Sequence, residues 1–290
     1  MTTVAPFDCS VYVAEGANLS YLDSGGDSPP LHFFHANGFP VSMYLPFMNE
    51  LSSDFRVLGL NLRGQDGLSE GIKSWHRLSF DLIGFLEQMK PGPVVGVGHS
   101  IGAVATLLAA ARRPDLFSRI VMLDPVLLPR RYILLLRLLK IIGKENAFPL
   151  AKRARRRRNG WGSREEALDY FRDKSLFRNW EDTYLRAYVT YGLKPDADGR
   201  TVLLCPPEAE ARGFENYPTD IWSWPGRLCV PTLIVRGENS DVLLPECYER
   251  FCRVCTPARG RIMNGVGHFI PMEKPSETLR MTRNSCFSQL

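Results

Sequence analysis

Short apolar runs rich in β-branched residues recur along the chain, and amphipathic stretches of helical length separate several of them. The runs predict strands near residues 11–13, 31–34, 56–60, 93–97, 119–123 and 231–235. Stretches 79–89 and 101–112 carry apolar residues at helical spacing. Strands that alternate with helices are typical of a mostly parallel sheet covered on both faces. The pattern therefore predicts an α/β fold with a doubly wound sheet.

The alternation stops between about residues 125 and 224, where the sequence becomes helical, aromatic and basic. A bare loop of this length is uncommon inside a compact domain. The aromatic residues favour a folded segment over disorder; they are Trp161, Tyr170, Phe171, Phe177, Trp180, Tyr184, Tyr188 and Tyr191. We therefore expect a helical cap over residues 126–225, inserted into a core made of residues 1–125 and 226–290.

The overall composition is consistent with this predicted fold, and only one segment of the chain has an unusual charge. The chain has 290 residues, 44% hydrophobic and 23% charged, which is ordinary for a globular protein. Much of its net charge of +5 comes from the basic run at 152–158, KRARRRR. Such a run is usually a solvated surface, but it also suits an anionic substrate such as a coenzyme A thioester. Without a recognisable nucleic-acid module it does not predict nucleic-acid binding.

The chain shows no sequence signal for secretion or membrane insertion. Its first residues, MTTVAPFDCS, lack a basic stretch followed by an apolar one, and no window reaches the roughly 18 apolar residues of a membrane span. Seven cysteines, an odd number, fit free thiols in a reducing compartment. We expect a cytoplasmic protein without stable membrane insertion.

Four of the cysteines have a spacing that superficially matches an iron–sulfur ligand set: Cys247, Cys252, Cys255 and Cys286. The intervening residues are bulky, and Pro245 followed by Glu246 is typical of the first turn of a helix. This favours core-facing cysteines on a helix. We therefore expect neither a metal nor a cofactor.

One serine stands where an apolar run gives way to a helical pattern. The segment VGVGHSIGA places Ser100 between Gly98 and Gly102, which matches G-x-S-x-G. When this pattern joins a strand to a helix, the sharp turn exposes the serine for attack, and the small flanking residues let strand and helix pack closely. We predict that Ser100 is a nucleophile.

A serine nucleophile needs a histidine base and an acid that orients it. His268 follows the last strand-like run on a glycine-rich loop, so it can reach the carboxyl edge of the sheet. For the acid we favour Asp241, in the loop after strand 231–235, because it completes the order Ser, Asp, His. Asp124, at the end of strand 119–123, and Glu238 are the alternatives.

The site also needs donors for the oxyanion that forms during acyl transfer. We expect one from the backbone N–H of Ile101, directly after the serine. The loop HANGFP (35–40) offers the second, and we favour the amide of Phe39 with Asn37 as the alternative. Asn37, His99 and Phe269 are candidate substrate contacts.

Several segments together resemble the α/β-hydrolase fold superfamily, and within it the capped, esterase-like serine hydrolases. They are GHSIG, HANGFP, NLRGQDGLS (61–69), RGENSD and GHFIPMEKP, and the resemblance covers about residues 10–125 and 226–280. HANGFP carries two residues between its histidine and glycine, and NLRGQDGLS begins with Asn61 and has an extra residue. In the superfamily the latter loop is mainly structural. The cap matches no pattern that we can name.

The resemblance implies several possible reaction classes, and the type of nucleophile reduces their number. Related dehalogenases and epoxide hydrolases use an aspartate, whereas Ser100 indicates acyl transfer. We expect a serine hydrolase that cleaves a carboxylic ester of a small to medium apolar substrate through an acyl-enzyme. A thioester or lactone hydrolase, a C–C bond hydrolase and a non-catalytic binding protein are the alternatives. A broken triad would indicate the last of these.

Overall fold

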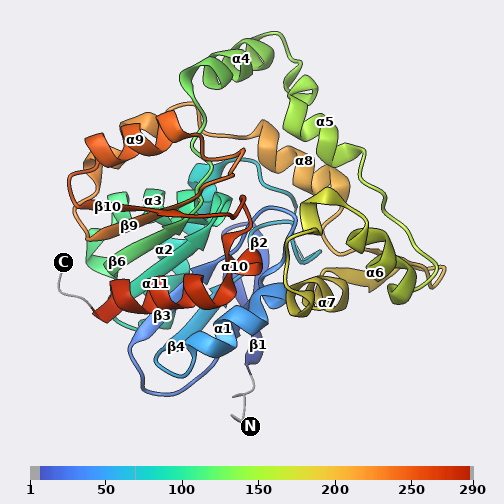
Figure 1. Cartoon of the computed structure of the whole chain (residues 1–290), viewed down its shortest axis with the longest axis horizontal. Coiled ribbons are helices and arrows are strands. Elements are labelled where there is room, and N and C mark those ends of the chain that lie inside the picture. Colours follow the sequence, from blue (N-terminus) through green and yellow to red (C-terminus); the bar gives the residue numbers. More distant parts are fainter. Residues whose placement is uncertain (1–6, 69, 288–290) are drawn as a thin grey trace.

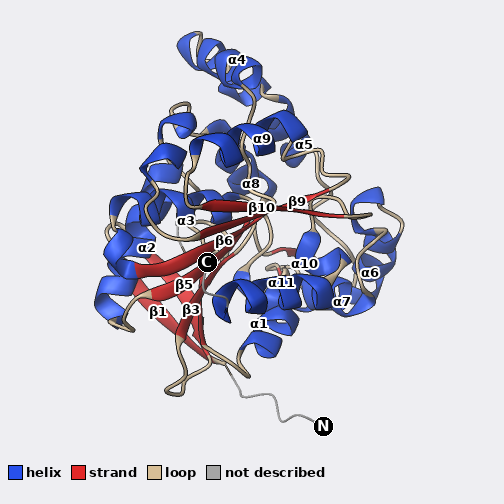
Figure 2. Ribbon diagram, turned by 60° about the vertical axis from the view of Figure 1, so that its left-hand side comes forward, coloured by secondary structure: helices blue, strands red, loops and turns tan. Residues whose placement is uncertain are grey.

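The computed structural model describes residues 7–68 and 70–287. Its centre is an eight-stranded sheet in the order β1-β2-β4-β3-β5-β6-β9-β10 (Figures 1 and 2). The strands are β1 (Asp8–Ala14), β2 (Ala17–Asp23), β3 (Pro30–Phe34), β4 (Arg56–Leu60), β5 (Val94–His99), β6 (Phe117–Leu123), β9 (Thr232–Gly237) and β10 (Ala258–Met263). β2 pairs antiparallel with β1 and β4, and the other neighbours are parallel. The predicted α/β fold is confirmed.

Helices cover both faces of this sheet, as the apolar strands require. Every residue of β5 is buried, so neither face of the central strand meets water. One core cluster joins the sheet to α2 (Trp75–Met89), α3 (Ile101–Arg112) and α9 (Pro245–Val254). A second joins the other face to α1 (Leu45–Leu51), α10 (Ile270–Glu273) and α11 (Pro275–Phe287). The sheet is doubly wound, as its sequence predicts.

The segment between β6 and β9, which we call the excursion, leaves the sheet and returns to it (Figure 1). Its helices are α4 (Arg130–Ile141), α5 (Pro149–Arg155), α6 (Arg164–Arg172), α7 (Asp182–Tyr191) and α8 (Pro207–Glu215). It also forms an antiparallel pair, β7 (Leu193–Pro195) and β8 (Thr201–Leu203), which the apolar pattern does not reveal. Three residues are too few to show an alternation.

Short 3₁₀ helices complete the connections: η1 (Val41–Tyr44), η2 (Pro114–Leu116), η3 (Glu145–Ala147), η4 (Ser175–Phe177), η5 (Ile221–Ser223) and η6 (Pro225–Arg227). The apolar pattern also leaves out β2, where Asn18, Ser20 and Asp23 interrupt the apolar positions. Among the described residues, no helix combines the length and apolarity needed to cross a bilayer.

The excursion packs against the loops at the carboxyl ends of the parallel strands. Phe39, in the loop after β3, lies 5.8 Å from Trp180 and 5.2 Å from Tyr188 between ring centroids. Phe269 lies 5.0 Å from Trp180. Open α/β sheets bind ligands at this edge, so these contacts place the excursion over the expected position of a site.

Candidate active site

Ser100 occupies a strained turn between β5 and α3. Its φ of 59° and ψ of −120° lie in a region that non-glycine residues rarely adopt. A Cβ at Gly98 would come within 2.5 Å of the Ala103 backbone, and one at Gly102 within 2.3 Å of the Phe34 carbonyl oxygen. The two glycines are therefore required by the close packing around the serine, as the motif predicts.

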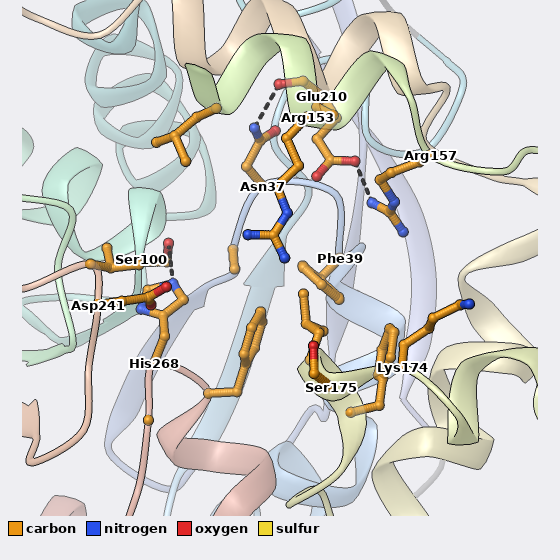
Figure 3. A pocket seen from close by; sticks show the side chains of 18 of the residues that line it. Asn37, Phe39, Ser100, Arg153, Arg157, Lys174, Ser175, Glu210, Asp241 and His268 are labelled. Carbon is orange, nitrogen blue, oxygen red and sulfur yellow. Dashed lines mark hydrogen bonds and ion pairs between the residues drawn. The ribbon is translucent and has the colours of Figure 1, made fainter. Parts of the chain in front are cut away.

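His268 lies beside this serine. Its Nε2 is 3.0 Å from the Ser100 Oγ (Figure 3), and its Nδ1 is 2.7 Å from the Asp124 Oδ2. Because a carboxylate only accepts, Nδ1 carries the proton and Nε2 is left to accept one from the serine hydroxyl. The three side chains form the relay that a nucleophilic serine needs.

Asp124 lies where the carboxyl ends of β6 and β9 meet. It follows β6 directly with a positive φ of 43°, and its amide donates to the Val235 carbonyl at 2.8 Å. Its carboxylate accepts from the Gly237 amide at 2.9 Å and from the Ser240 hydroxyl at 2.5 Å. Completely buried, it is fixed by these bonds to face His268.

The structure does not place Asp241 against His268, contrary to our expectation. Asp241 is exposed and lines the neighbouring cavity. Glu238, the other alternative, accepts the Gly265 amide at 2.7 Å and so holds a loop. Because β6 and β9 are adjacent in the sheet, the loops after both strands approach His268, and chain order alone does not distinguish them.

His99 is a positioning residue and does not contact the cavity, contrary to our expectation. The side chain is fully buried. Its Nε2–H donates to the His268 carbonyl at 3.0 Å, and its Nδ1 accepts from the Tyr44 hydroxyl at 2.8 Å. That hydroxyl also accepts the Ala36 amide at 3.3 Å. Burial lowers the pKa of His99 well below 6.5, which keeps the ring neutral for this role.

The expected oxyanion loop forms a tight turn in which the Phe39 amide is already engaged. Phe39 N–H donates to the Ala36 carbonyl at 3.3 Å, while Gly38 between them has a φ of +82°. The Phe39 ring lines the cavity instead. Among the described residues no hydrogen bond engages the Asn37 amide or the Ile101 amide. This arrangement favours Asn37 over Phe39.

Asn37 also lines the cavity, with its side chain tied back to the protein. Its Nδ2 donates to the Glu210 carbonyl at 2.8 Å, and its Oδ1 accepts from Gln65 Nε2 at 3.1 Å. Gln65 in turn accepts the Gly38 amide at 2.5 Å. Both ends of the side-chain amide thus help to fix the turn, and the backbone N–H is free to donate to a ligand.

The loop at 61–69 behaves as a structural element where it is described. Arg63 forms a buried ion pair with Asp81 at 2.6 Å. Asn61 accepts the Val41 amide at 2.9 Å and donates to Ser20 at 2.7 Å. Ser69 lies outside the described residues. These bonds connect the loop to α2 and β2, away from the Ser100 hydroxyl.

A cavity of about 650 Å³ opens beside Ser100 and His268 (Figure 3). The core contributes the nucleophile, its base, Ile101 and the Phe269 ring, whereas the excursion contributes its outer wall. Rings supply much of that wall: Tyr170, Phe171, Phe177 and Phe214. Charged side chains such as Arg153, Lys174 and Asp241 also line the cavity. A cavity that combines apolar walls with polar groups is typical of a site for a small organic molecule.

The four cysteines with the iron–sulfur-like spacing do not line this cavity. Cys247 is buried on α9, and Cys255 follows that helix, also buried. Burial raises the pKa of Cys247 to about 11 and of Cys255 to about 12, which favours the neutral thiols. In the described part of the chain no group of three or more His, Cys, Asp or Glu side chains is arranged to hold a metal ion.

Two residues of the site, Ser240 and Tyr44, are not identified by any pattern in the sequence. Ser240 lies within RGENSD, where a hydroxyl that supports the acid is indistinguishable from a turn residue. Tyr44 is one of many aromatic residues, and its role depends on η1 bringing it below His99. Both act through tertiary contacts.

Comparison with known proteins agrees with the fold and the motifs. A model of the alpha/beta hydrolase family matches residues 33–281. The 2-(acetamidomethylene)succinate hydrolase of Mesorhizobium japonicum is 24% identical over 262 residues, 89% of this chain and 88% of that protein. The crystal structure of an E-2-(acetamidomethylene)succinate hydrolase covers 98% of this chain and 100% of its own, with 21% identity and a TM-score of 0.81.

A further solved structure, the enol-lactonase from Burkholderia xenovorans, covers 96% of this chain and 100% of its own, with 18% identity and a TM-score of 0.72. At these identities the solved structures show a shared fold. The family model spans most of the sheet, the elbow at Ser100 and His268. The chain therefore belongs to the alpha/beta hydrolase family.

Proposed function

We propose that the protein is a serine hydrolase that cleaves a carboxylic ester through an acyl-enzyme on Ser100. The observation that carries this proposal is the continuous chain from Ser100 Oγ through the His268 ring to Asp124, at 3.0 and 2.7 Å. A fold reused only for binding would have no need to keep this geometry. The relatives' hydrolase names support the same reaction class.

The reaction begins with proton transfer from the Ser100 hydroxyl to His268 Nε2 as Oγ attacks the ester carbonyl. Asp124 stabilises the imidazolium that results and keeps the ring oriented. The oxygen of the tetrahedral intermediate accepts from the amides of Ile101 and Asn37. His268 then gives its proton to the leaving alkoxide, and the alcohol departs from the acyl-enzyme.

Deacylation uses the same groups in the opposite order. His268 takes a proton from water, whose oxygen attacks the acyl carbonyl, and returns that proton to Ser100 Oγ as the acid leaves. The aromatic wall of the cavity supports an apolar portion in the substrate. The seven thiols, all free in the structure, are suited to a reducing compartment such as the cytoplasm.

The direct test compares the wild type with Ser100→Ala on p-nitrophenyl butyrate and with a fluorophosphonate probe. We expect the probe to label the wild type at Ser100 and to leave the variant unlabelled, with ester turnover lost in parallel. Unchanged turnover in Ser100→Ala, or labelling at another residue, would contradict the mechanism. A panel of thioesters, lactones and β-diketones assayed beside the ester separates the alternative acyl bonds.

A further inference from the structure

Three arginines of the basic run at 152–158 line the cavity, Arg153, Arg157 and Arg158, and among the described residues only Arg153 of these has no ion pair. Arg155 bonds to Glu208 at 2.7 Å and to Glu215 at 2.6 Å, both on α8. Arg157 pairs with Glu210 and donates to the Tyr188 hydroxyl at 2.6 Å. These bonds fix α5 and the residues after it onto α8 and α7.

Arg158, the last member of the run, is also engaged. It pairs with Glu166, and its guanidinium lies 5.1 Å from the centroid of the Tyr170 ring. These glutamates together neutralise the charges of Arg155, Arg157 and Arg158. The run is therefore mainly a set of internal clamps, and it does not form an unbroken basic patch.

Arg153 differs from these three arginines. Leu150, Arg153, Ala154 and Arg157 all line the cavity, a spacing that places them along one face of α5 and its continuation. Figure 3 shows the Arg153 side chain descending from α5 into the cavity. Among the described residues no carboxylate pairs with it. Its guanidinium thus presents unneutralised charge to the bound substrate.

Lys174 adds a second positive charge to the cavity wall. It lies in the turn between α6 and η4, with its Nζ 4.2 Å from the centroid of the Tyr170 ring. No carboxylate pairs with it either, within the part of the chain that the structure describes. Ser175 and Asn179, from the same part of the cap, supply neutral polar groups to the lining.

Three carboxylates also line the cavity, and none of them forms an ion pair with Arg153 or Lys174. Glu210 is occupied by Arg157, and Glu273 accepts the amides of Gly267 at 2.8 Å and Phe269 at 3.2 Å. Asp241 comes from the core, on the same side as Ser100 and His268 (Figure 3). Its charge disfavours an anion near the nucleophile, so an anionic group is directed toward the cap.

We propose that Arg153, assisted by Lys174, binds an anionic oxygen group of the substrate, a carboxylate or a phosphate. This group lies at the end of the cavity that the excursion forms. This inference rests on the proposed function and specifies its substrate class. A guanidinium matches two oxygens of either group through parallel N–H bonds. The ion pairs of Arg155 and Arg157 fix the backbone of the segment that carries Arg153, which leaves only the Arg153 side chain to be ordered when the substrate binds.

The kinetic test uses substrates that differ in charge at matched chain length. For a carboxylate, p-nitrophenyl hexanoate is compared with the p-nitrophenyl monoester of adipic acid, which adds a carboxylate at the far end of the acyl chain. For a phosphate, hexanoyl-coenzyme A is compared with the hexanoyl thioester of N-acetylcysteamine. A higher kcat/KM for the charged substrate of one pair shows whether the site binds a carboxylate or a phosphate.

In Arg153→Gln we expect kcat/KM for the preferred charged substrate to fall about 10- to 100-fold relative to its uncharged partner. Arg153→Lys retains part of the preference, and added salt weakens it in the wild type. Arg156→Gln is the matched control, because Arg156 is exposed, belongs to the same run and lies outside the cavity lining. An equal ratio in Arg153→Gln and wild type overturns the proposal.

A binding measurement separates this proposal from the hydrolase proposal. Adipate and coenzyme A are titrated by calorimetry into Ser100→Ala and into Ser100→Ala/Arg153→Gln. Binding that requires Arg153 supports the anion site even if the wild type turns over no ester. Absence of binding to Ser100→Ala, together with equal turnover of charged and uncharged substrates, overturns the anion site and leaves the acyl-enzyme mechanism standing.

Discussion

His268 donates its Nδ1 proton to Asp124 at 2.7 Å, although the two residues follow different strands and lie 144 positions apart in the sequence. The bond selects the tautomer whose Nε2 faces Ser100. Asp124 in turn is oriented by the Gly237 amide at the end of β9 and by the Ser240 hydroxyl in the loop after it. The relay therefore depends on β6 and β9 being neighbours.

We expect Asp124→Asn to lower kcat on p-nitrophenyl butyrate by about 10⁴-fold, because an amide no longer selects the productive tautomer. Asp241→Asn is the matched variant and retains most of the wild-type kcat, since Asp241 makes no bond to His268 in the structure. Steady-state rates of the two purified variants decide between the acids. A greater loss in Asp241→Asn than in Asp124→Asn would contradict the structure.

Tyr44→Phe removes the hydroxyl that joins Ala36 to His99. We expect a loss of about 1–3 kcal/mol in the free energy of unfolding and a lower kcat, because His99 no longer fixes the His268 loop. Tyr217→Phe provides the control: its buried hydroxyl accepts the Leu128 amide at 3.0 Å in a similar way and makes no hydrogen bond to the relay residues. Denaturant titration and kcat are measured for both variants.

The outcome separates positioning from general stability. If Tyr217→Phe loses stability and keeps its kcat while Tyr44→Phe loses both, then the bond to His99 positions the base. If the two variants lose kcat equally, the effect belongs to folding and the positioning role is wrong.

His32 makes stability depend on pH. It is fully buried on β3 with neither ring nitrogen hydrogen-bonded, and burial lowers its pKa from 6.5 to about 3. Between these values the unfolded chain binds a proton that the folded protein excludes, so stability present above pH 6.5 is lost as the pH falls. For this one histidine the expected loss between pH 7 and pH 5 is about 2 kcal/mol.

His32→Leu tests that expectation by removing the titrating ring. Urea titrations at pH 7 and pH 5 are compared for variant and wild type, and the change between the two pH values should shrink by about 2 kcal/mol in the variant. His35, whose pKa burial lowers to about 4, keeps some of the dependence. Identical pH dependence in the two proteins would exclude His32 as a source.

Gly102→Ala tests the elbow itself. The added Cβ would meet the Phe34 carbonyl oxygen at 2.3 Å, and its nearest neighbours are all backbone atoms of Phe34 and His35, so no flexible group can move away. We expect a loss of at least about 1–3 kcal/mol in the free energy of unfolding, together with displaced Ser100 and reduced kcat. Gly226→Ala, whose nearest neighbour would be at 3.7 Å, should retain stability and activity. Equal stability of the two variants would refute the packing argument.

The features found correctly from sequence are those carried by neighbouring residues. Strand 56–60 and helix 101–112 match β4 and α3 because their apolar spacing directly reflects local backbone periodicity. The elbow is found because Gly98, Ser100 and Gly102 act within one turn. His268 is found because its glycine-rich loop follows the last strand.

The features that needed the structure depend on side chains brought together from distant segments. Asp124 and Asp241 both follow strands, and only the packing of β6 beside β9 selects the first. His99 lies next to the nucleophile in sequence, yet its ring turns into the core toward Tyr44. The Phe39 amide was expected to be free, but the turn at Gly38 closes it onto Ala36.

The sequence by itself determined the α/β class, the elbow and the histidine, because periodicity and turn chemistry act over a few residues. Only the tertiary structure decided which carboxylate contacts His268 and which arginine of the basic run faces the cavity without an ion pair among the described residues. Six of the seven residues at 152–158 are basic, so the sequence does not distinguish them. Glutamates from α8 and α6 neutralise Arg155, Arg157 and Arg158 and leave Arg153 facing the cavity, because charge pairing depends on distance in space and not along the chain.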